Sequence, residues 1–139
     1  MIKVIGFDGR QHVMNFDKIV REYTPPSSYH QKALDLLKKI CPSAQYYSEV
    51  SLVGCKGVEK RDLCADIFIP SFMSIIEIHG EQHYKYVKHF HKSEQGFAKY
   101  KANDKIKKEW CELNDISYIE LKYNEQDSWE QLIYDGINS

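Results

Sequence analysis

The sequence predicts an α/β domain in which helices flank a mixed β-sheet, with a small β arm in front of it. Two observations support this. Apolar residues at helical spacing, within 33–40 and 97–113, alternate with short β-prone runs at 45–53, 63–69, 72–79 and 116–121. The chain also has 139 residues, of which 42% are hydrophobic and 28% are charged, enough for one domain with a core and a polar surface. The expected order is a hairpin arm followed by α-β-β-β-α-β-α.

Residues 1–26 are expected to form the arm and its linker. The arm reads as two strands, Ile2–Phe7 and Gln11–Phe16, joined by a turn at Asp8-Gly9. Prolines and serines at 25–28 then interrupt both kinds of regular structure. The main domain is therefore expected to span 27–139.

Start and stop residues mark the elements of the main domain. Ser27 or Ser28 can cap a first helix, and Pro42 ends it. The next three runs are expected to be strands, because Gly54, Pro70 and Gly80 bound them in turn. We expect a long helix from about Ser93 to Asn114, a short strand at 116–121 and a closing helix at Trp129–Ile137.

Composition limits the classes of protein to consider. Lys and Arg number 19 against 20 Asp and Glu, so a basic surface must be local, as in residues 99–108 with five lysines and one acid. No run of 18 apolar residues occurs, and the N-terminus lacks the apolar run of a secretion signal. We therefore expect a cytoplasmic protein with reduced thiols, in which Cys64 and Cys111 are core residues.

Acidic residues interrupt the second and third predicted strands. A turn at Pro70-Ser71 would pair these strands antiparallel, with Asp66 opposite about residue 75 and on the same face as Glu77. His79 shares that face, because side chains two residues apart in a strand point the same way. Buried acids are costly unless they are paired or bind a cation. A convergent carboxylate pair is therefore expected to suit Mg²⁺ or Mn²⁺.

This pattern resembles the PD-(D/E)xK nuclease superfamily over about residues 27–123. The resemblance rests on Asp66 and on Glu77-x-His79, on the second and third strands after a helix. The stretch 76–84, IEIHGEQHY, with Asp104 and Lys107 on the next helix, looks like a subgroup of small phage and bacterial nucleases with an E-x-D/H-G-x-Q-H-Y/F signature. That subgroup is related to very-short-patch-repair and homing endonucleases, and His79 stands where the superfamily usually has lysine.

The resemblance implies a restriction-endonuclease-like fold and Mg²⁺- or Mn²⁺-dependent hydrolysis of DNA in a bacterial or phage-infected cell. Asp66 and Glu77 would hold the metal, and His79 and His83 would assist catalysis by carrying protons or steadying charge. Several further residues are expected to support this site, namely His30, Glu49, Gln82, Asp104 and Lys107.

A lysine stripe on the long helix is the predicted DNA contact. Lys101, Lys105 and Lys108 follow one another at i, i+4 and i+7, offset from the apolar face of the helix. If this stripe follows the phosphate backbone, binding should depend on salt and be largely independent of sequence.

Other interpretations remain open. The chain could be a catalytically inactive nucleic-acid-binding module of the same fold, or an HNH-type nuclease using His89 and His91. A zinc site of Cys111, His83, His89 and His91 is a further alternative, although residues 88–92 are better explained as a solvated loop anchored by Phe90. The oligomeric state is open, and a homodimer is among the options.

Overall fold

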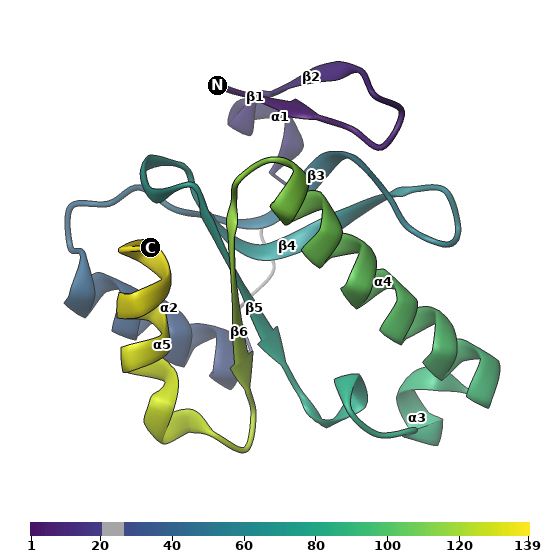
Figure 1. The fold of residues 1–139 in the computed structure, drawn as a ribbon. Coiled ribbons are helices and arrows are strands. Elements are labelled where there is room, and N and C mark those ends of the chain that lie inside the picture. The colour runs from purple at the N-terminus through teal and green to yellow at the C-terminus, as the bar shows by residue number, and fades with distance from the viewer. Residues whose placement is uncertain (21–26) are drawn as a thin grey trace.

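The fold is built on one four-stranded mixed sheet. The computed structural model describes residues 1–20 and 27–139. The sheet consists of β3 (Tyr47–Lys56), β4 (Asp62–Ile69), β5 (Ser74–His79) and β6 (Ser117–Lys122), in that spatial order. Pairs β3–β4 and β4–β5 are antiparallel and β5–β6 is parallel, which confirms the predicted α/β class with a mixed sheet (Figure 1).

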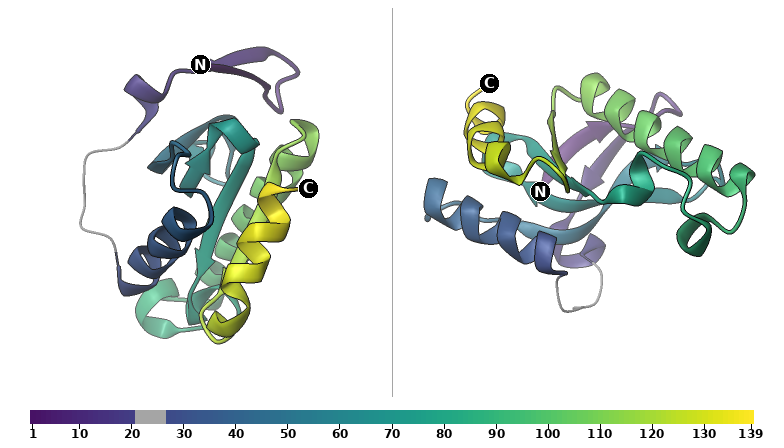
Figure 2. Two further views of the ribbon diagram at one scale, coloured as in Figure 1. Left: turned by 90° about the vertical axis from the view of Figure 1, so that its left-hand side faces the viewer. Right: turned by 90° about the horizontal axis from the view of Figure 1, so that it is seen from below.

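Helices cover both faces of the sheet. The helices α2 (Ser28–Ile40) and α5 (Trp129–Ile137) lie together on one side, and α4 (Glu94–Leu113) lies on the other (Figures 1 and 2). The side chain of Ser27 accepts a hydrogen bond from the amide of His30, which confirms the predicted start of α2. The α2/α5 side has its own apolar core, which includes Leu37, Ile67, Ile76, Leu121, Trp129 and Ile133.

The N-terminal arm contributes to the core on the α4 side. As predicted, it contains an antiparallel hairpin of β1 (Ile2–Ile5) and β2 (Gln11–Met14). The second strand ends before Phe16, because Asn15 caps the short helix α1 (Phe16–Ile19). Side chains of the arm are buried with those of the sheet and of α4, namely Val4, Met14, Val50, Leu52 and Trp110. The predicted boundary at residue 26 falls in 21–26, outside the described residues.

A side-chain amide joins the arm to the end of α4. Asn114 Oδ1 accepts a hydrogen bond from the amide of Ile5 at 2.6 Å, and Asn114 Nδ2 donates to the carbonyl of Ile5 at 3.0 Å. The side-chain amide of Asn114 thus bonds to the N–H and the C=O of one residue, as the backbone of a neighbouring antiparallel strand would do. The arm is thereby held to a residue that lies 109 positions later in the chain.

Gly54 lies inside β3, so the prediction that a strand ends there is wrong. The strand continues to Lys56, with a register shift between Ser51 and Lys56. Gly54 has a φ of +79°, and an added Cβ would lie 2.7 Å from the Cα of Gly6. The amide of Phe7 donates to the carbonyl of Gly54 at 3.2 Å. Because Gly54 has no side chain, the backbone of the arm at Gly6 and Phe7 can lie directly against the backbone of β3.

The predicted register between β4 and β5 is also wrong, by two residues. The connection is longer than expected, because the 3-10 turn η1 (Pro70–Phe72) is followed by Met73 in a left-handed conformation. The observed pairs include Ile67 with Ile76, which puts Asp66 opposite Glu77. A shift of two residues leaves every side chain on its predicted face.

Between β5 and α4 the chain forms two short elements. These are η2 (Glu81–His83) and α3 (Lys88–His91), which lie beyond the end of β5 and beside the start of α4 (Figure 1). A third 3-10 turn, η3 (Gln126–Ser128), precedes α5. Within residues 1–20 and 27–139, no helix has the length and apolar character needed to cross a membrane.

We expect Gly54→Ala to loosen the arm. The added methyl group meets backbone at a positive φ, so the free energy of unfolding should fall by about 1–3 kcal/mol. Gly9→Ala is a matched control, because Gly9 has a φ of +76° and open space around it. Urea unfolding of both variants should show the larger loss for Gly54→Ala, and equal losses would contradict the close-contact explanation.

Candidate functional site

Two carboxylates link β4 to β5 where the backbone ladder between them ends. The amide of Asp66 donates to Glu77 Oε2 at 2.9 Å, and the amide of Ile78 donates to Asp66 Oδ2 at 2.8 Å. The last ladder pair before them is Ile67 with Ile76. Each side chain thus takes the place of a backbone acceptor on the opposite strand. The structure brings together Asp66 and Glu77, the two acids that the sequence pattern singled out.

Burial makes ionisation of this pair unfavourable. Glu77 is 1% exposed. Burial, together with the nearby charge of Asp66, raises the pKa of Glu77 to about 7. Burial also raises the pKa of Asp66 above its usual range, although the hydrogen bond from Ile78 opposes this. Near neutral pH the two acids therefore need a cation to be fully ionised together.

Lys107 supplies a cation to the pair. Its ammonium group donates a hydrogen bond to Glu77 Oε1 from the inner face of α4. Burial alone would lower the pKa of Lys107, but the carboxylates of Glu77 and Asp66 outweigh burial and raise it. Two carboxylates facing one ammonium would carry a net charge of −1 when all three are ionised.

The inward position of Lys107 has a signal in the sequence. Tyr100, Asp104, Lys107 and Cys111 lie at i, i+4, i+7 and i+11, so they share one face of α4. Cys111 is 1% exposed and belongs to the core cluster on that side. The sequence pattern placed Lys107 only among supporting residues, whereas the structure puts it in direct contact with Glu77.

Two histidines continue the polar cluster at the end of β5. His79 Nδ1 lies 3.2 Å from Glu120 Oε1 on β6, and its Nε2 lies 3.2 Å from the hydroxyl of Tyr118. His79 is 2% exposed. The hydrogen bond from His79 lowers the pKa of Glu120 to about 2. An ionised carboxylate only accepts, so Nδ1 carries a proton, and in the neutral imidazole the tyrosine hydroxyl donates to Nε2.

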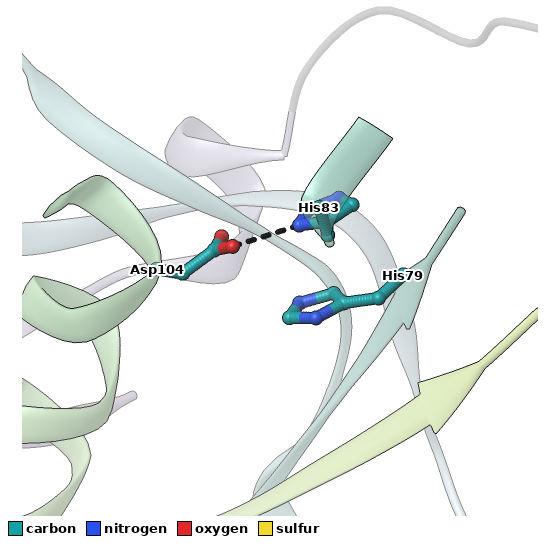
Figure 3. A group of neighbouring side chains, drawn as sticks. All are labelled: His79, His83 and Asp104. Carbon is teal, nitrogen blue, oxygen red and sulfur yellow. Dashed lines mark hydrogen bonds and ion pairs between the residues drawn. The ribbon is translucent and has the colours of Figure 1, made fainter. Parts of the chain in front are cut away.

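His83 repeats this arrangement on η2. Its Nδ1 lies 2.9 Å from Asp104 Oδ2 (Figure 3). Its Nε2 lies 3.2 Å from the hydroxyl of Tyr100. The rings of His79 and His83 are stacked, with centroids 3.8 Å apart and planes 5° from parallel. The site therefore contains two similar series of hydrogen-bonded side chains, and in each series a tyrosine hydroxyl, an imidazole and a carboxylate follow one another.

His79, His83 and Asp104 also form a group with metal-ligand atoms within 4.8 Å of one another. A histidine lone pair lies in the plane of its ring, so two stacked rings cannot direct their lone pairs at one ion. Each ring nitrogen also already has a hydrogen-bond partner. The arrangement therefore suits proton transfer better than metal binding. Cys111 and His89 are not part of this group, and within the described ranges the residues of the alternative zinc site are not brought together.

Of three further predicted supporting residues, Glu49 acts on the central pair, whereas His30 and Gln82 contact other residues. His30 is buried on α2, with Nε2 3.2 Å from Ser48 Oγ, and burial lowers its pKa. Glu49 follows Ser48 with a φ of +55°, and its charge contributes to raising the pKa of Asp66. Gln82 lies beside Tyr100, whose pKa is raised mainly by burial.

The predicted lysine stripe is exposed but partly neutralised by neighbours. Lys101 Nζ donates to the carbonyl of His83 at 3.1 Å, and Lys108 Nζ lies 3.4 Å from Glu120 Oε1. Lys105 Nζ lies 4.0 Å from Glu109. Lys101 and Lys108 therefore connect the outer side of α4 to the histidine cluster.

Residues 88–92 are not a solvated loop anchored by Phe90, so that prediction is wrong. Phe90 is 58% exposed, whereas His91 is 6% exposed. His91 Nδ1 accepts a hydrogen bond from the amide of Val87 at 3.0 Å, which closes the short helix α3 on itself. His91 is thus the anchor. Sequence patterns gave no signal for this inversion, because both residue types occur in either position.

Comparison with known proteins gives one partial likeness. The chain is 34% identical over 62 residues to the uncharacterized protein 307L of Invertebrate iridescent virus 6. That match covers 45% of this chain and 32% of the viral protein, so the chain spans about a third of that relative. No family model matches the chain, and no solved structure matches it.

We expect metal-free protein to lose stability through Glu77 as the pH rises. Its pKa is about 7 in the folded state against an ordinary glutamate value of 4.5, so between these values the native state holds a proton that the unfolded state has released. The free energy of unfolding should then fall by up to about 1.4 kcal/mol per pH unit from roughly pH 5 to 7. Urea unfolding in chelator should show this slope, and Glu77→Gln should show a clearly smaller one, because only the raised pKa of Asp66 then contributes. Equal slopes in both proteins would contradict the raised pKa.

Proposed function

We propose that this protein is a metal-dependent endonuclease that hydrolyses phosphodiester bonds in DNA. The observation that carries the proposal is the interlocked pair of Asp66 and Glu77 on adjacent strands, with Lys107 bonded to Glu77. Hydrolysis of a phosphodiester needs negative charge to be offset and a water to be activated, and a carboxylate pair with a nearby ammonium offers groups for both. The likeness of these residues to the PD-(D/E)xK pattern supports the same reaction.

The donor set of this pair fits a divalent cation. Hard oxygen ligands suit Mg²⁺ or Mn²⁺, and one or two protein carboxylates are usual for Mg²⁺. Asp66 Oδ2 and Glu77 Oε2 are held by backbone amides, while Asp66 Oδ1 accepts no hydrogen bond from the part of the chain that is described. The burial of the pair adds a reason for a cation to bind there. When bound, such an ion activates water and offsets charge on the phosphate.

The remaining side chains have roles that follow from their contacts. Lys107 offsets charge beside Glu77 and orients its carboxylate. In this arrangement His79 and His83 are placed to move protons, because each links a tyrosine hydroxyl to a carboxylate. Lys101, Lys105 and Lys108 would contact DNA phosphates along the exposed side of α4, giving salt-dependent binding with little sequence preference.

One observation favours a second candidate, a nucleic-acid-binding module of the same fold without catalysis. Lys107 already satisfies one oxygen of Glu77, so a side chain of the protein itself compensates part of the buried charge. A site stabilised in this way would keep its geometry after losing turnover. The two candidates differ in whether any divalent ion produces cleavage.

Cleavage of DNA should require Mg²⁺ or Mn²⁺ and stop in chelator. Asp66→Asn and Glu77→Gln should each lower the rate by at least about a hundredfold, because each removes an oxygen ligand with its charge. Plasmid and oligonucleotide cleavage, followed on gels, measures this. Glu109→Gln is the matched control, because Glu109 lies exposed on the outer side of α4, where its only ion pair within residues 1–20 and 27–139 is with Lys105.

Near-normal rates in either variant would move the catalytic site elsewhere. DNA binding without cleavage under every divalent ion would instead identify the inactive module. Circular dichroism of each variant separates loss of chemistry from loss of fold.

His79→Ala should lower the cleavage rate by about 10² to 10⁴, the range for a group that transfers a proton. His12→Ala is the matched control, because His12 also pairs with a carboxylate, that of Asp8, but lies on the arm. Rates should be compared across about pH 5.5 to 8, where histidines usually titrate. A rate and pH profile that stay unchanged in His79→Ala would show that this imidazole is only structural.

A further inference from the structure

Residues 85–92 form a basic segment with exposed aromatic rings, and the proposed reaction does not use it. Its sequence is KYVKHFHK, with three lysines, two histidines and no acid. Tyr86 is 42% exposed and Phe90 is 58% exposed. Large aromatic rings at the surface are costly in water unless something covers them. The combination of positive charge and exposed rings points to a ligand that is both anionic and aromatic.

The segment holds a fixed shape. His91 is buried and accepts the amide of Val87, and its ring stacks on Tyr86 with centroids 6.0 Å apart. On its other sides His91 meets Phe97 and Tyr100 edge to face, at 5.0 and 5.2 Å. Lys92 ends the helix in a left-handed conformation. Tyr86 and Phe90 are therefore presented by an anchored turn, which lowers the entropy cost of binding.

The same contacts join the segment to the candidate site. Tyr100, which meets His91, also contacts His83 Nε2 through its hydroxyl. In the chain, Tyr86 follows His83 by three residues, and α3 lies beyond the end of β5 beside the start of α4 (Figure 1). A DNA strand that passes His83 at the candidate site would therefore also pass this turn.

Exposed rings distinguish between the possible forms of DNA. In a duplex the base faces are covered by their neighbours, and only phosphates, sugars and groove edges are accessible. Unpaired bases offer their faces, and they stack on aromatic side chains beside cations that follow the backbone. The charges of Lys85, Lys88 and Lys92 suit the phosphates of such a strand, although Lys85 also lies 4.0 Å from Glu81.

We propose that residues 85–92 bind an unpaired DNA strand, with bases stacked on Phe90 and Tyr86, so that the substrate carries a single-stranded extension beside the bond to be cut. This inference rests on the proposed nuclease function for its link to cleavage. The binding itself is independent of turnover and can be measured without metal.

The experiment measures fluorescence anisotropy of labelled DNA in chelator, where no cleavage occurs. Three probes of matched sequence are needed: a single strand, a blunt duplex, and that duplex with a single-stranded extension. The Tyr86→Ala/Phe90→Ala double variant should bind the single strand and the extended duplex at least about tenfold more weakly. Its affinity for the blunt duplex should stay unchanged, and Phe90→Trp should retain full affinity because the ring face is kept.

Tyr134→Ala is the matched control for loss of an exposed ring. Tyr134 is 54% exposed on α5, on the opposite side of the sheet from α4. Unchanged affinity of the double variant for the single strand, or an equal loss for all three probes, would overturn the inference. Failure of wild-type protein to bind any of the probes would overturn it as well.

Cleavage assays with Mg²⁺ then separate the inference from the proposed function. If the double variant loses selective binding while wild-type protein never cuts, strand binding is upheld and the nuclease proposal fails. If wild-type protein cuts blunt and extended duplexes equally and the double variant does the same, the nuclease proposal is upheld and the inference fails. Preferred cutting beside an extension, lost in the double variant, supports both.

Discussion

The free-energy cost of enclosing two carboxylates between β4 and β5 determines how this half of the molecule is built. Even after relaxation, a buried unpaired charge costs several kcal/mol. Here two backbone amides and one lysine reduce that cost. The amides come from the strands themselves, where the ladder ends. The lysine comes from α4, so the helix must keep one particular face toward β5 for the arrangement to persist.

That requirement divides α4 into two functional halves. Toward its C-terminal end, Trp110 and Cys111 are buried in an apolar core shared with the arm. Toward its N-terminal end, the same face carries Tyr100 and Asp104, which contact His83. The apolar half fixes the helix against the sheet. The polar half can then hold charged and hydrogen-bonding groups at set positions without contributing much to stability.

Much of the fold follows from local patterns in the chain. Helical spacing and capping residues located α2, α4 and α5, and β-prone runs located the strands, because these signals depend on near neighbours. The pairing of Asp66 with Glu77 was predictable even though the turn was placed wrongly, since an error of two residues preserves the face. Gly54 was mistaken for a strand end because its function depends on the arm, which is distant in sequence.

The candidate site was harder to predict from the sequence, because it also depends on contacts between residues that are distant in the chain. The position of Lys107 could have been found by noting polar residues at helical spacing with a buried cysteine, but a lysine on a helix usually faces water. The exchange of roles between Phe90 and His91 has no local signal. It depends on Tyr86, Phe97 and Tyr100 meeting around one imidazole.

The bonds between Asn114 and Ile5 set an order for folding. The arm precedes α4 in the chain, yet its partners include Trp110 and Asn114, near the end of that long helix. Contacts between such distant residues form late, because closing a long loop costs entropy before any contact repays it. During synthesis on the ribosome the arm is made before α4, so the core beneath the arm closes only when α4 is complete.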